Sequence, residues 1–203
     1  MISKIDSSYI QHDGSRVCQG DIFRDWKYDY RIYSDEKGTL SIEKIDLPYM
    51  IVLSQDCDLE GDFKNRNNPD FKNDDILEVK HDKFLHSILV CPAYLSEQLK
   101  QGTHLQRLGF TMEIIGTNKW NDIKNNTNPR YHFLMSHLKF QIPDLAIDFK
   151  HYFTIPRDKL YETAKNHYIA SVNELFRESL SQRFAYYLSR VGLPELTNQP
   201  VNQ

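Results

Sequence analysis

Five polar or reactive side chains follow directly after an apolar run in the first third of this chain. The run at 47–53 has the length and composition of a buried strand, and residues 54–58 then read Ser-Gln-Asp-Cys-Asp. Side chains on irregular backbone at the end of a rigid strand are a frequent location of function. Cys57 offers a thiol, while Asp56 and Asp58 offer carboxylates that could orient a base or hold a metal ion. These three are our first candidate site residues.

Two flanking carboxylates are an unfavourable setting for a nucleophilic cysteine, because nearby negative charge raises the pKa of a thiol and suppresses the thiolate. A cysteine hydrolase would need a histidine beside Cys57. The histidines considered for that position are His86, His132 and His137. The alternative is a tight turn in which Asp56 and Asp58 cap backbone N–H groups and Cys57 packs as a small buried residue.

A second candidate pair follows the Asn-rich stretch at 118–128, where the sequence reads Arg130-Tyr131-His132. An arginine and a histidine beside an aromatic ring suit phosphate contact, base stacking and proton transfer on RNA. Arg130 and His132 therefore join the candidate catalytic residues, with Asp56 and Asp58 as orienting groups. The alternative is the start of a strand with one solvated face.

Metal and cofactor motifs are sparse. The three cysteines, Cys18, Cys57 and Cys91, are odd in number and far apart, which argues against a disulfide framework, and no CxxC pair is present. P-loop, GxGxxG and GxSxG patterns are also missing. The sequence thus predicts no cofactor and no metal-binding residue. It leaves open whether the cysteines, each near a strand end, meet with a histidine around a soft metal.

Length and composition limit the number of domains and the possible classes of partner. A chain of 203 residues with 40% hydrophobic and 12% aromatic content fits one domain, or one domain with an appendage. The formal net charge of −3 provides no overall basic field for nucleic acid. No apolar run approaches the roughly 18 residues that span a bilayer, and the first residues show no signal pattern. We expect a soluble, cytoplasmic protein without a membrane partner.

The elements that position the candidate residues are mainly strands. Alternation and apolar runs predict strands at 20–23, 28–33, 39–45, 49–54, 87–92, 131–135, 145–149 and 151–155. A hairpin turn is expected at 35–38 and a short polar helix at 95–108, broken by Gly102. The stretches 59–75 and 118–128 lack periodicity and are rich in Asn and Asp, so both are predicted to be loops.

The C-terminal part is expected to be helical. From Ser171 to Val191 the apolar residues recur in steps of three and four, which is the pattern of an amphipathic helix. Ser171 and Glu174 have the spacing of a capping box. We therefore divide the chain into a β-barrel domain at 1–160, with insertions at about 59–75 and 95–128, and a helical segment at 161–194 packed on the barrel.

The order of four short motifs resembles the MazF/PemK-like toxin family. The motifs are Gly20-Asp21-Ile22, the strand from Pro48 to Ser54, the strand from Ile88 to Pro92, and the segment from Asp148 to Leu160, which contains Thr-Ile-Pro-Arg-Asp-Lys-Leu at 154–160. Together they cover roughly residues 18–160. Two family positions used in cleavage differ, since Leu47 replaces an arginine and Ala93-Tyr94 replace a threonine.

The resemblance implies an α+β protein built on a mostly antiparallel, SH3-like β-barrel, with long insertions and C-terminal amphipathic helices. It also implies an RNA-facing site at the strand ends, and so an RNA endonuclease in a toxin–antitoxin or phage-defence setting. The alternative function is a non-catalytic module that binds a protein partner, or a second copy of itself, through the C-terminal helix. A third functional hypothesis is a hydrolase that depends on Cys57 or on a metal ion.

Overall fold

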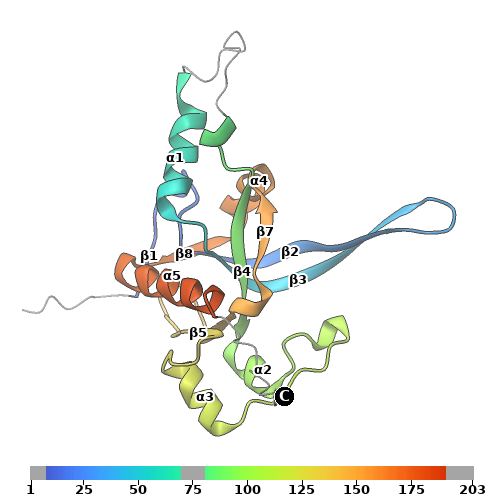
Figure 1. The fold of residues 1–203 in the computed structure, drawn as a ribbon, viewed down its shortest axis with the longest axis vertical. Coiled ribbons are helices and arrows are strands. Elements are labelled where there is room, and N and C mark those ends of the chain that lie inside the picture. Colours follow the sequence, from blue (N-terminus) through green and yellow to red (C-terminus); the bar gives the residue numbers. More distant parts are fainter. Residues whose placement is uncertain (1–7, 70–80, 191–203) are drawn as a thin grey trace, which may run out of the picture.

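The computed structural model describes residues 8–69 and 81–190. Within these ranges the protein is α+β, with one antiparallel sheet that curls into a half-barrel and five α-helices around it (Figure 1). The sheet follows the order β1-β8-β2-β3-β4-β6-β5, and β7 pairs with β4. This confirms the α+β class and the antiparallel sheet expected from the sequence.

The strands and helices have the following bounds. The strands are β1 (Tyr9–Ile10), β2 (Asp21–Ser34), β3 (Leu40–Val52), β4 (Ser87–Leu95), β5 (Tyr131–Leu134), β6 (Leu145–Asp148), β7 (Phe153–Pro156) and β8 (Tyr168–Val172). The helices are α1 (Asp56–Asn67), α2 (Ser96–Gln101), α3 (Thr117–Lys124), α4 (Arg157–His167) and α5 (Glu174–Leu188), with 3₁₀ turns η2 (His81–Lys83), η3 (Gln106–Leu108) and η4 (Phe149–His151). No described helix has the length and apolar character needed to cross a membrane.

Strands β2 and β3 form a long hairpin that projects from the body as an arm (Figure 1). Its tip is the predicted turn, in which the Asp35 carboxylate accepts the N–H groups of Lys37 and Thr39 and Gly38 adopts φ +79°. At the base of the arm the ladder is interrupted opposite Pro48, which has no N–H to donate, and Asp25 there adopts φ +55°. The turn prediction at 35–38 is confirmed.

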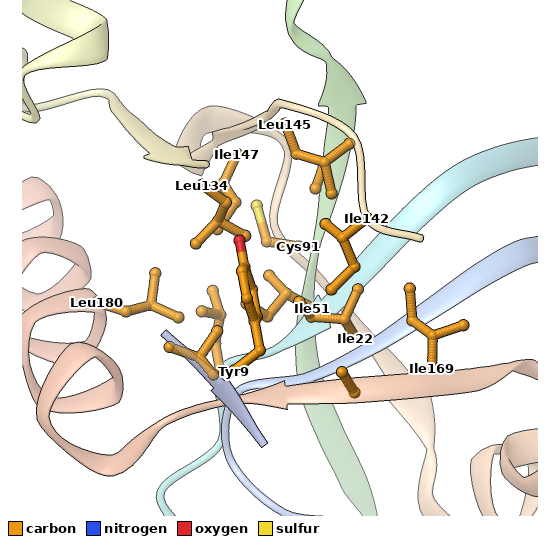
Figure 2. Packing of buried hydrophobic residues seen from close by; sticks show 14 of the residues in the cluster. Tyr9, Ile22, Ile51, Cys91, Leu134, Ile142, Leu145, Ile147, Ile169 and Leu180 are labelled. Atoms are coloured by element: carbon orange, nitrogen blue, oxygen red, sulfur yellow. The ribbon is translucent and has the colours of Figure 1, made fainter. Parts of the chain in front are cut away.

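The sheet separates two hydrophobic clusters because neighbouring residues of a strand point to opposite faces. Ile22 and Ile51 pack on one face with Tyr9, while Phe23 and Met50 pack on the other. Figure 2 shows the first cluster, in which side chains from β2, β3, β4 and β6 meet Leu180 of α5. The second cluster is covered by α4. The central strands are therefore buried on both sides, as their unbroken apolar runs predicted.

The two predicted polar loops are wrong over most of the residues that the structure describes, although 125–128 do form a turn and a bend. Residues 56–67 form α1 and residues 117–124 form α3, whereas 70–75 lie outside the described residues. Helix α1 buries only Leu59 and Asp62, so it carries no apolar period that the sequence could reveal. It is attached instead by the buried Asp62 carboxylate, which accepts hydrogen bonds from Arg66 (2.8 Å) and Arg157 (2.9 Å).

The C-terminal helix begins later than expected. Ser171 belongs to β8, which pairs with both β1 and β2, so the predicted capping box is wrong. Helix α5 buries Leu180 and Phe184 but leaves Leu175 and Leu188 exposed. The apolar residues that recur every three or four positions therefore do not form one continuous buried stripe. The first of them lies in β8, and those of α5 are partly buried and partly exposed.

Gly102 ends α2 in the left-handed conformation (φ +70°), and a Cβ there would lie 2.5 Å from the carbonyl oxygen of Met112. Gly109 has a similar φ of +76° but open space around it. Left-handed backbone costs a non-glycine residue about 1–2 kcal/mol. We expect Gly102→Ala to lower the free energy of unfolding clearly more than Gly109→Ala, as measured by urea denaturation. Equal losses in the two variants would contradict the close approach of α2 to residue 112.

Candidate functional site

The Ser-Gln-Asp-Cys-Asp segment forms the start of α1 rather than a turn that gathers its side chains. The Asp56 carboxylate accepts two hydrogen bonds from the guanidinium of Arg16 (3.2 and 3.0 Å) and one from the Gln19 N–H (3.1 Å). Burial opposes ionisation of Asp56, but the Arg16 and Gln19 hydrogen bonds outweigh it and lower its pKa. Cys57 and Asp58 are exposed, and the Cys57 thiol lies 3.8 Å from Asp58 Oδ1.

Arg130 and His132 lie on either side of Tyr131 at the start of β5, and their side chains have different surroundings. Arg130 makes a two-pronged ion pair with the fully buried Asp148 (2.8 and 2.6 Å). His132 is buried against Phe149, and its Nδ1 has no hydrogen-bond partner.

The structure does not bring the five sequence-predicted residues together. In Figure 1 helix α1 lies above α5 and strand β5 lies below α5. Among the described residues no hydrogen bond or ion pair joins Asp56, Cys57 or Asp58 to Arg130 or His132. Only Arg130 belongs to a larger group of side chains that can carry chemistry.

That group, the Asp148 cluster, consists of Tyr94, His104, Arg130, Asp148 and His151. The Tyr94 hydroxyl lies 3.0 Å from His151 Nδ1, and the same nitrogen lies 3.6 Å from Asp148 Oδ2. The rings of Tyr94 and His104 pack with centroids 4.6 Å apart. Neither ring nitrogen of His104 has a hydrogen-bond partner, although both nitrogens are buried.

The two histidines of the cluster favour the neutral form. Burial lowers the pKa of His104, and a proton on the neighbouring His151 would lower it further. Burial also lowers the pKa of His151, against the opposing effect of the Asp148 carboxylate. Burial raises the pKa of Tyr94, so its hydroxyl keeps its proton. Neutral imidazoles beside a hydroxyl can accept and relay protons near neutral pH.

Two clefts open beside this cluster, and Leu47 contributes to both. The aromatic cleft has a volume of about 470 Å³. Its walls include the rings of Tyr28, Tyr94, Phe110 and Phe153, the imidazole of His151, and the side chains of Leu47 and Leu105. The polar cleft has a volume of about 680 Å³ and is lined by residues that include Lys27, Asp46, His104 and Arg107. A mainly apolar pocket with a few polar groups is the usual form of a ligand site.

Sequence reasoning missed Tyr94, His104 and His151 as site residues. They come from β4, from the segment after α2 and from η4, so no local spacing connects them. Tyr94 was noted only as a departure from the MazF/PemK-like pattern. A signal for the group exists only in the strand pairing, which places Tyr94 of β4 opposite Ala146 of β6, two residues before Asp148.

A second polar group lies at the start of β2. His12, Cys18 and Asp21 each offer one metal-ligating atom, and these atoms all lie within 4.8 Å of one another. Within the described part of the chain this is the one group of three or more such residues, so Cys57 and Cys91 do not meet Cys18 around a metal. Cys91 is buried, and its thiol lies 3.1 Å from the backbone oxygen of Asp148.

Comparison with known proteins does not add to this picture: no protein-family model, no curated protein and no solved structure matches the chain.

The environment of His132 makes a pH dependence testable. Burial and the nearby charge of Arg183 lower its pKa to about 3, whereas an unfolded histidine titrates near 6.5. Between these values only the unfolded chain binds the proton, so the free energy of unfolding falls as the pH falls, by up to ~1.4 kcal/mol per pH unit. We expect His132→Leu to lose less stability than the wild type between about pH 6 and about pH 4, as measured by urea denaturation.

The exposed His81 supplies the control, since His81→Leu should leave the pH profile unchanged. Parallel profiles for the wild type and His132→Leu would show that His132 is not held neutral in the folded protein.

Proposed function

We propose that this protein binds single-stranded RNA in the aromatic cleft and cleaves it with the histidines of the Asp148 cluster. In this proposal it is an SH3-like, MazF/PemK-like nucleic-acid-binding protein whose acting groups differ from those of the family. The observation that carries the proposal is the aromatic cleft itself, in which four aromatic rings and the imidazole of His151 face one space.

Aromatic walls suit unstacked bases. The rings of Tyr28 and Phe153 lie 4.3 Å apart and form one side of the cleft, while Phe110 is about half exposed. Every base has a flat face, so stacking on such rings binds single strands with little dependence on sequence. The chain has no excess of positive charge, and stacking rather than charge would therefore supply most of the affinity.

Charged groups are present where the phosphates would lie. Lys27 and Arg107 line the polar cleft next to the aromatic cleft. Arg130 and Asp148 neutralise each other and therefore add little net charge to the site. Their ion pair instead holds the cluster in position. For single-stranded RNA each phosphate contact contributes about −0.7 to the slope of log K against log salt concentration. Two contacts therefore predict a shallow slope of about −1.4.

The histidines supply the proton transfers. The His104 ring borders the polar cleft with both nitrogens covered, so in this proposal it turns until one nitrogen reaches a ribose 2′-hydroxyl. That nitrogen accepts the hydroxyl proton as the oxygen attacks the neighbouring phosphorus, and the bond from phosphorus to the 5′-oxygen breaks. The protonated fraction of His151, whose charge the Asp148 carboxylate at 3.6 Å stabilises, gives a ring proton to the leaving oxygen, and both rings exchange protons with solvent afterwards. The hydrogen bond between Tyr94 and His151 Nδ1 holds that ring in place. The product would carry a 2′,3′-cyclic phosphate.

RNA binding tests the cleft. Phe110→Ala removes an exposed ring from its wall and should weaken binding of a fluorescent single-stranded RNA by about 5- to 150-fold, the range for loss of one stacking ring. Tyr186→Ala removes another exposed ring, on α5 and outside the cleft lining, and is the matched control. Fluorescence anisotropy measures both. Equal affinity of Phe110→Ala and the wild type would rule out the aromatic cleft as the RNA site.

Cleavage tests the histidines. His104→Ala and His151→Ala should each slow cleavage of the bound RNA by about 100-fold or more, the typical contribution of general acid–base groups. His81→Ala, which changes an exposed histidine of η2, should retain the wild-type rate. Gel analysis of labelled RNA under single-turnover conditions measures the rate. Bound but intact RNA with the wild-type protein would reduce the function to RNA binding alone.

The projecting arm favours a second candidate function, the binding of another copy of this chain. Ile32 and Ile42 are paired across the two strands, and Leu40 lies on the same face; they are 65%, 53% and 72% exposed. Charged residues of both signs surround this face, namely Arg31, Lys37 and Lys44 with Asp35, Glu36 and Glu43. Such a mixed pattern complements itself when two arms pack face to face.

The oligomeric state tests this candidate and also the expectation that α5 mediates dimerisation. We expect the wild type to be a dimer in light scattering, Ile42→Lys to be a monomer, and Leu175→Lys on α5 to remain a dimer. A monomeric wild type would remove the candidate, and a monomeric Leu175→Lys would move the interface to α5.

A further inference from the structure

His12, Cys18 and Asp21 form a compact group that the RNA-binding proposal does not use. His12 follows β1, and Cys18 and Asp21 flank the turn that leads into β2. His12 Nε2 lies 2.9 Å from Asp21 Oδ1, and the ligating atoms of all three residues lie within 4.8 Å of one another. An imidazole nitrogen, a thiol sulfur and a carboxylate oxygen thus lie close together at the loop between β1 and β2.

The Asp21 carboxylate is nearly inaccessible, at 1% exposure, and has no lysine or arginine beside it in the described structure. It accepts hydrogen bonds from the Cys18 N–H (2.8 Å) and the Ser171 hydroxyl (2.6 Å). The nearby Arg16 is paired with Asp56 instead. Since a buried carboxylate is costly unless a positive charge accompanies it, Asp21 needs either a protonated His12 or a bound cation beside it.

The ligand types narrow the choice of cation. An imidazole nitrogen, a thiolate sulfur and a carboxylate oxygen are the ligands of Zn²⁺, whereas Mg²⁺ and Ca²⁺ prefer oxygen alone. Zinc sites with three protein ligands keep the fourth position for water or a small ligand. A cavity of about 260 Å³ begins at this group, and His12, Asp21, Arg16 and Lys165 all line it.

We propose that His12, Cys18 and Asp21 bind one Zn²⁺ ion whose fourth coordination position opens into this cavity. The Cys18 thiol releases its proton to solvent when the metal binds, and the proton of His12 moves from Nε2 to Nδ1. The Gly14 N–H, which now donates to His12 Nδ1 (3.0 Å), must then turn away. Gly14 has open space around it and the conformational freedom to do so.

The metal would hold the connection between β1 and β2 in place. Asp21 is already tied to β8 through Ser171, whose hydroxyl lies 2.9 Å from that of Tyr168. The same loop reaches α1 through the hydrogen bond from Gln19 N to Asp56. Zinc would therefore fasten a loop that contacts the sheet, α1 and α4, and the cavity beside it would admit a water molecule or a small anion near Arg16 and Lys165.

Metal titration of the metal-free full chain tests the proposal. We expect one equivalent of Zn²⁺ to bind in calorimetry, and Co²⁺ as a probe to give a thiolate-to-cobalt charge-transfer band. Cys18→Ser should abolish that band and weaken Zn²⁺ binding by at least about 100-fold, since even changes around a metal ligand cost up to that factor. The exposed Cys57→Ser is the matched control and should behave as the wild type.

Circular dichroism of each metal-free variant establishes whether it is folded. If Cys18→Ser does not fold, His12→Gln provides the same titration with a different ligand removed. The proposal fails if the wild type binds no stoichiometric Zn²⁺, or if a folded Cys18→Ser or His12→Gln retains wild-type affinity. It also fails if the cobalt band depends on Cys57.

Discussion

The buried carboxylate of Asp148 is the constraint around which one half of the molecule is arranged. It is completely shielded from water, so its charge requires Arg130, which approaches from the segment before β5. It also accepts the Lys150 N–H that begins η4 and lies close to His151. Removing one partner of such a pair typically costs about 3–5 kcal/mol, because the other charge is left buried alone. The pair thus fixes the positions from which Tyr94 and His151 reach the aromatic cleft.

Ion pairs of the buried Asp62 and the half-buried Asp56 likewise hold other elements in place. Asp62 joins α1 to α4 through Arg157, and Asp56 joins the start of α1 to the loop before β2 through Arg16. Ion pairs therefore attach helices that bury few apolar side chains. Each pair specifies geometry more strictly than an apolar contact, since a guanidinium and a carboxylate meet in a fixed planar arrangement.

This use of charge determines how much of the fold the sequence could reveal. The strands were predictable because apolar runs such as that at 87–92 reflect burial on both faces of a sheet. Helix α1 was not, because ion-paired aspartates leave no periodic signal. In the site, Arg130 was identified by its residue type, but its partner Asp148 and the neighbouring His104 and Tyr94 come from distant segments. Strand pairing brings these segments together, and the pairing of distant strands cannot be recognised from local sequence patterns.

The place of β8 between β1 and β2 has a consequence for biosynthesis. Strand β2 obtains its second neighbour only when residues 168–172 have left the ribosome, although β2 itself ends at Ser34. Until then one edge of β2 has unpaired N–H and C=O groups, and the β1 segment has no strand partner. Sheet closure is therefore a late, long-range event during translation, of the kind that slows folding and exposes nascent chains to chaperones.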